Sequence, residues 1–281
     1  MTSTRITLEH GGGGTAMLEL LAETVLKEFK LKKAGPVGLD ELDDGAAIKI
    51  GETTLIFTTD SHTVNPLFFP GGDIGRLAVA GTVNDLAVMG GRPLAMACAV
   101  VVEEGFEIEK FKEIVRSMGR TAEEVGMALV TGDFKVIERG NLDGMVITTT
   151  GVGVAKELKT DSMLRPGDKI LINGPVGNHG ATILAQREGL QVMGELKSDV
   201  APIWCVVEAA LSVGGVSAMK DPTRGGLAGA LNELASKSRV GILIQEKAIP
   251  VEESVRAFCE MLGLDPLYLI NEGKVVIGVS G

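Results

Sequence analysis

Acidic side chains placed where loops and apolar runs end carry the clearest chemical signal in this sequence. Asp43 and Asp44 precede a glycine in a loop, Asp60 and Asp133 each close an apolar run, and Asp85 lies inside one. Carboxylates that converge at the mouths of buried strands repel one another unless a cation lies between them. Hard oxygen ligands favour Mg²⁺ or a similar ion, and Mg²⁺ in turn favours polyphosphate. The pattern therefore predicts a site for a metal–nucleotide complex.

A run of glycines near the N-terminus is a second candidate for phosphate contact. Gly11, Gly12, Gly13 and Gly14 precede Thr15, a residue type that caps helices. Glycine lets the backbone approach a phosphate closely, and the N-terminus of the helix that follows favours an anion. The sequence has no Gly-Lys-Ser/Thr after this run, so it is not a Walker A loop. A plain N-terminal segment is an equal alternative for these glycines.

Lys135 could supply a positive charge to polyphosphate, and His179 could bind a ligand. Each residue also has an ordinary structural explanation. Lys135 lies two residues after Asp133 and could neutralise polyphosphate as a point charge, or be a solvated lysine at a strand end. His179 follows Asn178 in a second glycine loop, residues 174–180. It could bind a ligand, or be a loop histidine with a hydrogen-bond partner of its own.

Two further motifs stand in the second half of the chain. Asp221-Pro-Thr-Arg224 places an acid and an arginine at a helix start, an anion-binding arrangement that capping by Thr223 would also explain. Glu272 follows the apolar run 267–270 in an Asn-Glu-Gly sequence, for which a surface turn is the other explanation. The sequence has no Ser-His-Asp order, HExxH motif or cysteine pair, so serine hydrolase and zinc chemistry lack support.

Composition excludes several classes of function. The net charge of −10 over 281 residues disfavours a nucleic-acid groove and an anionic membrane surface. Aromatic residues make up 4%, which argues against base-stacking platforms, whereas 45% apolar residues allow a sizeable core. Cys98, Cys205 and Cys259 lie far apart, as in proteins of reducing compartments. The sequence shows no membrane-spanning run and no signal-peptide pattern, so we expect a cytoplasmic protein.

The elements that must position these residues follow a mixed, α+β pattern. Helices are expected from Thr15 and over residues 75–89, 108–125, 224–236 and 255–262, and strands over residues 46–50, 54–59, 95–102, 127–131, 145–154, 169–174 and 216–220. Gly51-Glu52 between the first two strands predicts a hairpin. Strand and helix do not alternate regularly enough for a doubly wound sheet. We expect an N-terminal domain of residues 1–158 and a C-terminal domain of residues 159–281.

As a set, the motifs resemble the aminoimidazole-ribonucleotide-synthetase-like ATP-binding superfamily, and within it the HypE family of hydrogenase maturation proteins. The resemblance is carried by Asp43-Asp44-Gly-Ala-Ala, Thr58-Thr-Asp60-Ser-His62, Val83-Asn84-Asp85-Leu-Ala-Val-Met-Gly90-Gly-Arg-Pro93, Thr131-Gly-Asp133-Phe-Lys135, Asp221-Pro-Thr-Arg224-Gly-Gly226 and Asn271-Glu272-Gly273. The early glycine loop, the Thr-Thr-Asp-Ser-His run and Gly177-Asn178-His179-Gly180 favour the HypE family over its relatives. The likeness spans nearly the whole chain.

The resemblance implies a homodimer whose N-terminal domains join in a β-barrel at the interface, each domain binding ATP, beside a sandwich-like α+β C-terminal domain. It implies Mg²⁺ held with the triphosphate by Asp43, Asp44, Asp60, Asp85 and Asp133. The residues assigned to nucleotide binding are Gly11, Gly12, Gly13, Asp44, Asn84, Asp133, Asn178, His179, Asp221 and Arg224. By the same likeness, Lys135 would spread the charge of the transferred phosphoryl group and Glu272 is the candidate base.

The activity that the resemblance implies is ATP-dependent dehydration of an S-carbamoyl cysteine to a thiocyanate. In the family this cysteine ends the protein's own flexible tail, and the carbamoyltransferase HypF supplies the carbamoyl group. The cyanide then reaches the iron of nickel–iron hydrogenase through the HypC–HypD complex. This sequence ends at Ser280-Gly281, and Cys259 lies in an amphipathic run. We therefore expect the chain as given to bind ATP and dimerise, but not to be its own substrate.

Other functions stay open on the sequence alone. Thiamine-monophosphate kinase, selenophosphate synthetase and the purine synthetase share the acid cluster. Selenophosphate synthetase needs a reactive Cys or selenocysteine near the glycine loop, which this sequence lacks, whereas the kinase is not excluded. A non-enzymatic ATP-binding module that docks hydrogenase accessory proteins is the other alternative. ATP turnover with thiamine monophosphate would favour the kinase, and binding without turnover would favour the module.

Overall fold

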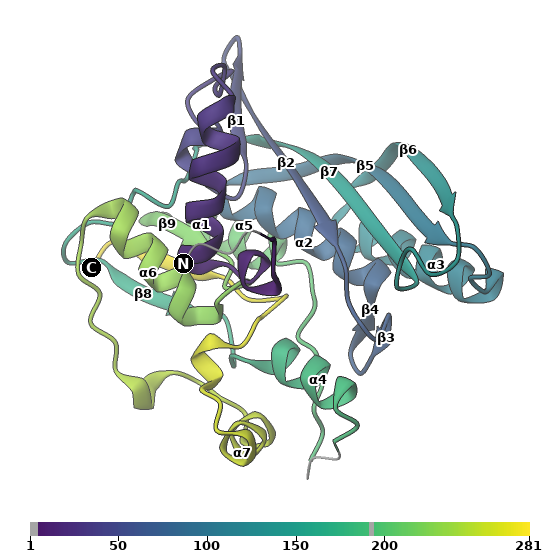
Figure 1. The fold of residues 1–281 in the computed structure, drawn as a ribbon. Coiled ribbons are helices and arrows are strands. Elements are labelled where there is room, and N and C mark those ends of the chain that lie inside the picture. The colour runs from purple at the N-terminus through teal and green to yellow at the C-terminus, as the bar shows by residue number, and fades with distance from the viewer. Residues whose placement is uncertain (1–4, 191–193) are drawn as a thin grey trace.

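A five-stranded sheet forms the centre of the N-terminal half, with strands in the order β1-β2-β7-β5-β6 (Figure 1). The computed structural model describes residues 5–190 and 194–281. The strands are β1 (Ala46–Ile50), β2 (Thr53–His62), β5 (Gly91–Glu103), β6 (Ala128–Ile137) and β7 (Met145–Ala155). Ile50 pairs with Thr53, which confirms the predicted hairpin. Neighbouring strands are antiparallel except β5 and β6, which run parallel because α3 (Ile108–Val125) returns the chain between them.

Two helices cover one side of this sheet, as Figure 1 shows. α2 (Ile74–Val88) packs on β2, β7 and β5, and nearly all of its residues are buried. Its first turn is capped by Asp73, whose carboxylate accepts hydrogen bonds from the backbone N–H groups of Gly75 and Arg76. α3 packs on α2 and β6. These two helices confirm the predictions over residues 75–89 and 108–125.

The strand β6 lies at one edge of the sheet with its side chains exposed. Its exposed large apolar residues are Leu129, Val130, Phe134 and Val136. The other edge is β1, so the described residues of one chain form an open sheet and not a closed barrel. An exposed apolar edge is typical of an interaction site. The barrel expected between two chains stays a prediction.

A three-stranded antiparallel sheet in the order β8-β10-β9 forms the centre of the second half. The strands are β8 (Lys169–Ile172), β9 (Val216–Lys220) and β10 (Val276–Val279), and the helices are α4 (Asn178–Arg187), α5 (Trp204–Val213), α6 (Gly226–Ser238) and α7 (Glu253–Leu262). Val276 packs in a cluster with α6 and its neighbour Ile277 in a cluster with α5. Adjacent strand residues point to opposite faces, so a helix covers each face of this sheet. Both halves mix helices and strands, which confirms the α+β class.

Shorter elements connect these parts. They are α1 (Gly14–Leu21), the π-helical turn Ala22–Leu26, the two-stranded ribbon of β3 (Phe68–Phe69) and β4 (Gly72–Asp73), and the 3₁₀ turns Leu8–Gly11, Leu39–Glu41, Glu246–Ala248 and Pro266–Tyr268. Gly13 is the N-cap residue of α1, so the expectation that Thr15 caps this helix is wrong. The predicted domain boundary after residue 158 lies in the connection between β7 and β8. Among the described residues, no helix has both the length and the apolar character needed to cross a membrane.

Candidate active site

A cleft of about 540 Å³ lies between the two halves of the chain. Its walls come from the N-terminal glycine loop, the loop before β1, the end of β2, α2 and the connection from β9 to α6. Ten predicted site residues line it: Gly11, Gly12, Gly13, Asp43, Asp44, Asp60, Asp85, Asp221, Arg224 and Glu272. Both halves contribute walls, so the cleft requires them to be packed together.

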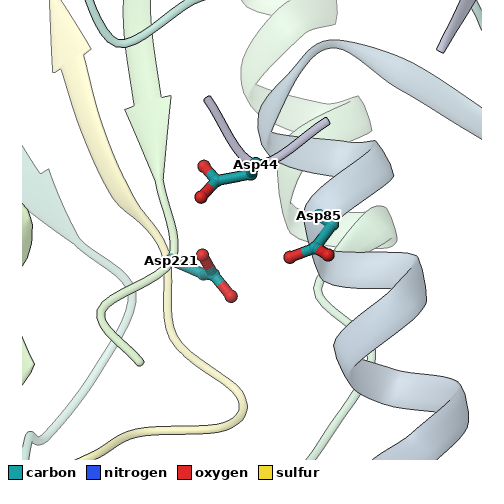
Figure 2. Close-up of side chains that lie close together, drawn as sticks. All are labelled: Asp44, Asp85 and Asp221. Atoms are coloured by element: carbon teal, nitrogen blue, oxygen red, sulfur yellow. The ribbon is translucent and has the colours of Figure 1, made fainter. Parts of the chain in front are cut away.

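Three carboxylates crowd together in this cleft (Figure 2). Asp44 comes from the loop before β1, Asp85 from α2 and Asp221 from the end of β9, and one oxygen of each lies within 4.8 Å of the other two. The sequence predicted Asp85 as a metal ligand, Asp221 as a nucleotide-binding residue and Asp44 as both. The structure places all three together. Three hard oxygen donors at this spacing are a suitable partial ligand set for Mg²⁺.

The acids of this cluster hold their protons more tightly than ordinary carboxylates do. Burial is the largest cause, and repulsion from neighbouring acids adds to it. The pKa of Asp44 is raised to about 6, that of Asp221 to about 8, and that of Asp85 well above its usual value. A divalent cation among the three would favour their charged forms, so the cluster fits a metal ion.

Asp43 is held instead in a buried network of ion pairs. Lys237 Nζ lies 2.8 Å from Asp43 Oδ1 and 2.9 Å from Asp161 Oδ2. Lys220 Nζ lies 2.8 Å from Asp44 Oδ1 and 3.1 Å from the same Asp161 oxygen. The network joins the loop before β1 to β9 and α6. Sequence reasoning missed both lysines and Asp161; the nearest signal is the position of Lys220 beside Asp221, which does not distinguish it from any strand-end lysine.

Asp60 faces the side-chain nitrogens of a histidine and an arginine at the cleft. Its Oδ2 lies 3.7 Å from His62 Nδ1 and its Oδ1 lies 3.5 Å from Arg224 Nη2. His62 is buried, which lowers its pKa, and its Nε2 lies 3.0 Å from Thr149 Oγ1. Gly13 has a φ of +84°, and a Cβ there would lie 3.0 Å from the Cβ of Arg224. The glycine loop therefore closes against Arg224, and both can reach an anion in the cleft.

Asp133 and Lys135 are not in this cleft. They lie on the exposed strand β6, where Lys135 Nζ is 3.6 Å from Asp133 Oδ2. The strand register shows how far apart they are. Asp60 on β2 pairs with Thr149 on β7. Thr149 pairs with Cys98 on β5, and Cys98 pairs with Gly132 on β6. Three strand spacings separate β2 from β6, roughly 14 Å. Within one chain, the predicted metal ligand Asp133 and the predicted catalytic Lys135 lie apart from the acid cluster.

Asn178 and His179 begin α4 and are buried outside the residues that line the cleft. His179 Nδ1 lies 2.8 Å from Ser198 Oγ, and its ring meets Phe69 edge-on at 5.4 Å between centroids. Burial lowers the pKa of His179 to about 4. These contacts give His179 the role of a hydrogen-bonded core histidine, the ordinary alternative that the sequence left open.

Asn84 and Glu272 lie next to each other in space, but only Glu272 lines the cleft. Asn84 is 1% exposed and does not line it; its side-chain Nδ2 donates to the backbone oxygens of Ala201 and Glu272. Glu272 does line it, and burial together with repulsion from Asp221 and Asp199 raises its pKa well above the usual value. A carboxyl group with a raised pKa beside a cation site is suited to proton transfer.

Comparisons with known proteins agree on one family. The profile described as AIR synthase related protein, N-terminal domain, matches residues 42–155, and the C-terminal domain profile matches residues 165–281. The chain is 49% identical to a putative hydrogenase expression/formation protein of Methanocaldococcus jannaschii, covering 98% of this chain and 83% of that protein. It is 47% identical to carbamoyl dehydratase HypE of Azotobacter vinelandii, covering 96% of this chain and 79% of that protein.

Solved structures give the same result. A crystal structure of a HypE–HypF complex matches with a TM-score of 0.86 and 43% identity, covering 92% of this chain and 84% of that one. A structure of HypE in complex with ATP matches with a TM-score of 0.80 and 45% identity, covering 98% and 82%. A thiamine monophosphate kinase from Aquifex aeolicus matches with a TM-score of 0.71 at 17% identity, covering 98% and 90%, a likeness in fold alone.

Proposed function

The chain belongs to the HypE family of hydrogenase maturation proteins, and we propose that it is a carbamoyl dehydratase that uses ATP to convert an S-carbamoyl cysteine to a thiocyanate. The observation that carries this proposal is the meeting of Asp44, Asp85 and Asp221 with the protonatable Glu272 in one cleft. A cation site beside a proton-transfer group is what phosphorylation followed by elimination requires.

The proposed reaction proceeds in two steps. The carbamoyl oxygen attacks the γ-phosphorus of ATP, ADP leaves, and one N–H proton is lost. The carbon–oxygen bond then breaks with phosphate as the leaving group, the second N–H proton is lost, and a carbon–nitrogen triple bond forms. Phosphorylation is needed because the carbamoyl oxygen is by itself a poor leaving group. The sum is conversion of carbamoyl cysteine and ATP to thiocyanate, ADP and phosphate.

The residues of the cleft would have separate roles in metal binding, phosphate binding and proton transfer. Asp44, Asp85 and Asp221 would hold Mg²⁺, which supplies charge neutralisation for the phosphates. Arg224 and the backbone N–H groups of the glycine loop would bind phosphate oxygens. Glu272 in its charged form would accept an N–H proton from the substrate. Asp60, held between His62 and Arg224, would fix the position of that arginine.

We also propose a homodimer that joins the sheets of two chains. Support comes from the exposed apolar side chains of β6, which lies at an edge of the sheet. In such a dimer, Asp133 and Lys135 would face the nucleotide of the partner chain. This arrangement would reconcile their assigned roles with their distance from the acid cluster of their own chain.

The partners of the proposed reaction follow from the family. We propose that HypF provides the carbamoyl group and that the HypC–HypD complex accepts the cyanide; a HypE relative of this chain has been solved with HypF. Cys98, Cys205 and Cys259 are free thiols, which supports a reducing, cytoplasmic compartment. The kinase alternative has only likeness of fold in its favour.

A direct test supplies the substrate as a peptide that ends in S-carbamoyl cysteine. We expect ATP hydrolysis by the chain to depend on this peptide and on Mg²⁺, and to be unaffected by thiamine monophosphate. Hydrolysis stimulated by thiamine monophosphate would favour the kinase. ATP binding with no turnover on either compound would favour a binding module.

A further inference from the structure

Asn84 makes three hydrogen bonds that tie α2 to the second half of the chain. Its Nδ2 donates to the backbone oxygen of Ala201 at 3.2 Å and to that of Glu272 at 3.1 Å. Its Oδ1 accepts from the backbone N–H of Ile203 at 2.9 Å. With 1% exposure the side chain is closed to solvent and to any ligand in the cleft. Both amide protons and the oxygen are therefore used on main-chain groups.

The backbone of Glu272 is held from two sides. Its oxygen accepts from Asn84 and from the backbone N–H of Ala201, and its N–H donates to Asp199 Oδ1 at 3.2 Å. Asn84 precedes Asp85, one of the three clustered acids, on α2. The amide of Asn84 thus links the segment that bears the cation-site carboxylate to the segment that bears Glu272.

The chemistry of the link requires an amide. An aspartate would place a second oxygen against the two carbonyl oxygens, and an alanine would leave three buried main-chain groups without these partners. Substitution of Asn84 therefore frees the Glu272 segment to shift, although it changes no group that contacts the nucleotide.

We propose that Asn84 is a positioning residue, which fixes Glu272 relative to Asp85 by bonding the Glu272 backbone from α2. This inference rests on the proposed role of Glu272 in proton removal. Misplacement of a reacting group by about 1 Å can slow catalysis about 100-fold without weakening substrate binding. Asn84 thus acts on the rate of dehydration and not on the affinity for ATP.

The test compares dehydration of the S-carbamoyl cysteine peptide by wild type, Asn84→Ala, Glu272→Gln and the double variant. Asp73→Ala is the matched control, because Asp73 caps the same helix but makes no contact with Glu272. We expect Asn84→Ala to lose about 100-fold in kcat. We expect the Kd for Mg–ATP of Asn84→Ala and the kcat of Asp73→Ala to stay within about twofold of wild type.

The double variant shows whether Asn84 acts through Glu272. If it does, Asn84→Ala/Glu272→Gln is no slower than Glu272→Gln alone, because the group that Asn84 positions is already lost. The inference would be overturned if the kcat losses of the two single variants multiplied in the double variant. It would also be overturned if Asn84→Ala were as active as Asp73→Ala. If Asn84→Ala does not fold, Asn84→Ser replaces it, since its hydroxyl is too short to bridge both segments. An inactive wild type would refute the proposed function itself. A fully active Glu272→Gln would leave that function standing but would remove Glu272 from the mechanism, and this inference with it.

Discussion

Glu272 is the residue on which the proposed proton transfer depends. It lines the cleft, and burial with neighbouring acids raises its pKa. Glu272→Gln keeps the shape of the side chain but removes the base, so we expect kcat for peptide dehydration to fall about 100- to 1,000-fold. Steady-state kinetics and calorimetry with Mg–ATP would measure the rate and the unchanged affinity. Glu260→Gln, an exposed change on α7, is the control; equal activity of the two variants would remove Glu272 from the mechanism.

His179 provides a test of pH dependence away from the chemistry. Its pKa is about 4 in the folded chain, below the usual 6.5. The unfolded state therefore takes up the proton first as pH falls, and stability is lost below about pH 6.5. From these two values, wild type should lose about 2 kcal/mol through this residue between about pH 7.5 and about pH 5.

The His179→Gln variant lacks this titration. Denaturant unfolding would measure the free energy of unfolding of both proteins at about pH 7.5 and about pH 5. The difference between wild type and variant should be smaller at the lower pH by about 2 kcal/mol. An advantage that stays constant with pH would show that His179 does not titrate as its burial predicts.

Single residues differ in how far the sequence could place them. Asp44, Asp85 and Asp221 were identified because their settings can be read directly from the sequence: a loop before glycine, the inside of an apolar run and a helix start. Asp161 and Lys237 were missed because their partners lie far away along the chain and meet only after folding. Asn84 was assigned to the nucleotide by the resemblance, in which it forms part of the same motif as Asp85. On a helix, neighbouring side chains point about 100° apart, and Asn84 faces the second half of the chain.

At the scale of elements, the glycine loop offers a matched pair of substitutions. Gly13 and Gly14 both have positive φ, but a Cβ on Gly13 would press on Arg224, whereas one on Gly14 would meet open space. Both changes to alanine place a Cβ on a residue with positive φ, a conformation that favours glycine. We expect Gly13→Ala to weaken Mg–ATP binding about tenfold more than Gly14→Ala, a difference of about 1.4 kcal/mol. Calorimetric titration of both variants would measure it, and equal affinities would mean that the loop does not act through Arg224.

Periodicity predicted the main elements well and their pairing less well. Apolar spacing located α2 and α3, and the Gly51-Glu52 turn located the hairpin of β1 and β2. The parallel pairing of β5 with β6 was not predicted, because it depends on where α3 returns the chain. The short ribbon of β3 and β4 has two residues per strand, too few for any period to show.

At the scale of the whole molecule, the proposed dimer predicts that two inactive variants restore each other. Lys135→Ala keeps Glu272, and Glu272→Gln keeps Lys135. If Lys135 acts on the partner's nucleotide, a mixed dimer contains one intact site. Equal mixing after exchange of subunits should then restore roughly a quarter of wild-type activity, since half of the dimers are mixed and each has one of two sites. No recovery from a mixture shown to contain mixed dimers would place Lys135 and Glu272 in the same chain's site or remove Lys135 from catalysis.

The central claim is that ATP drives removal of the carbamoyl oxygen as phosphate. Its most direct test is mass spectrometry of a peptide ending in S-carbamoyl cysteine, with a heavy oxygen isotope in the carbamoyl group, incubated with the chain and Mg–ATP. We expect the peptide to lose the mass of one labelled water for each ATP consumed, and the label to appear in inorganic phosphate. An unchanged peptide, or a label released into solvent water, would contradict it.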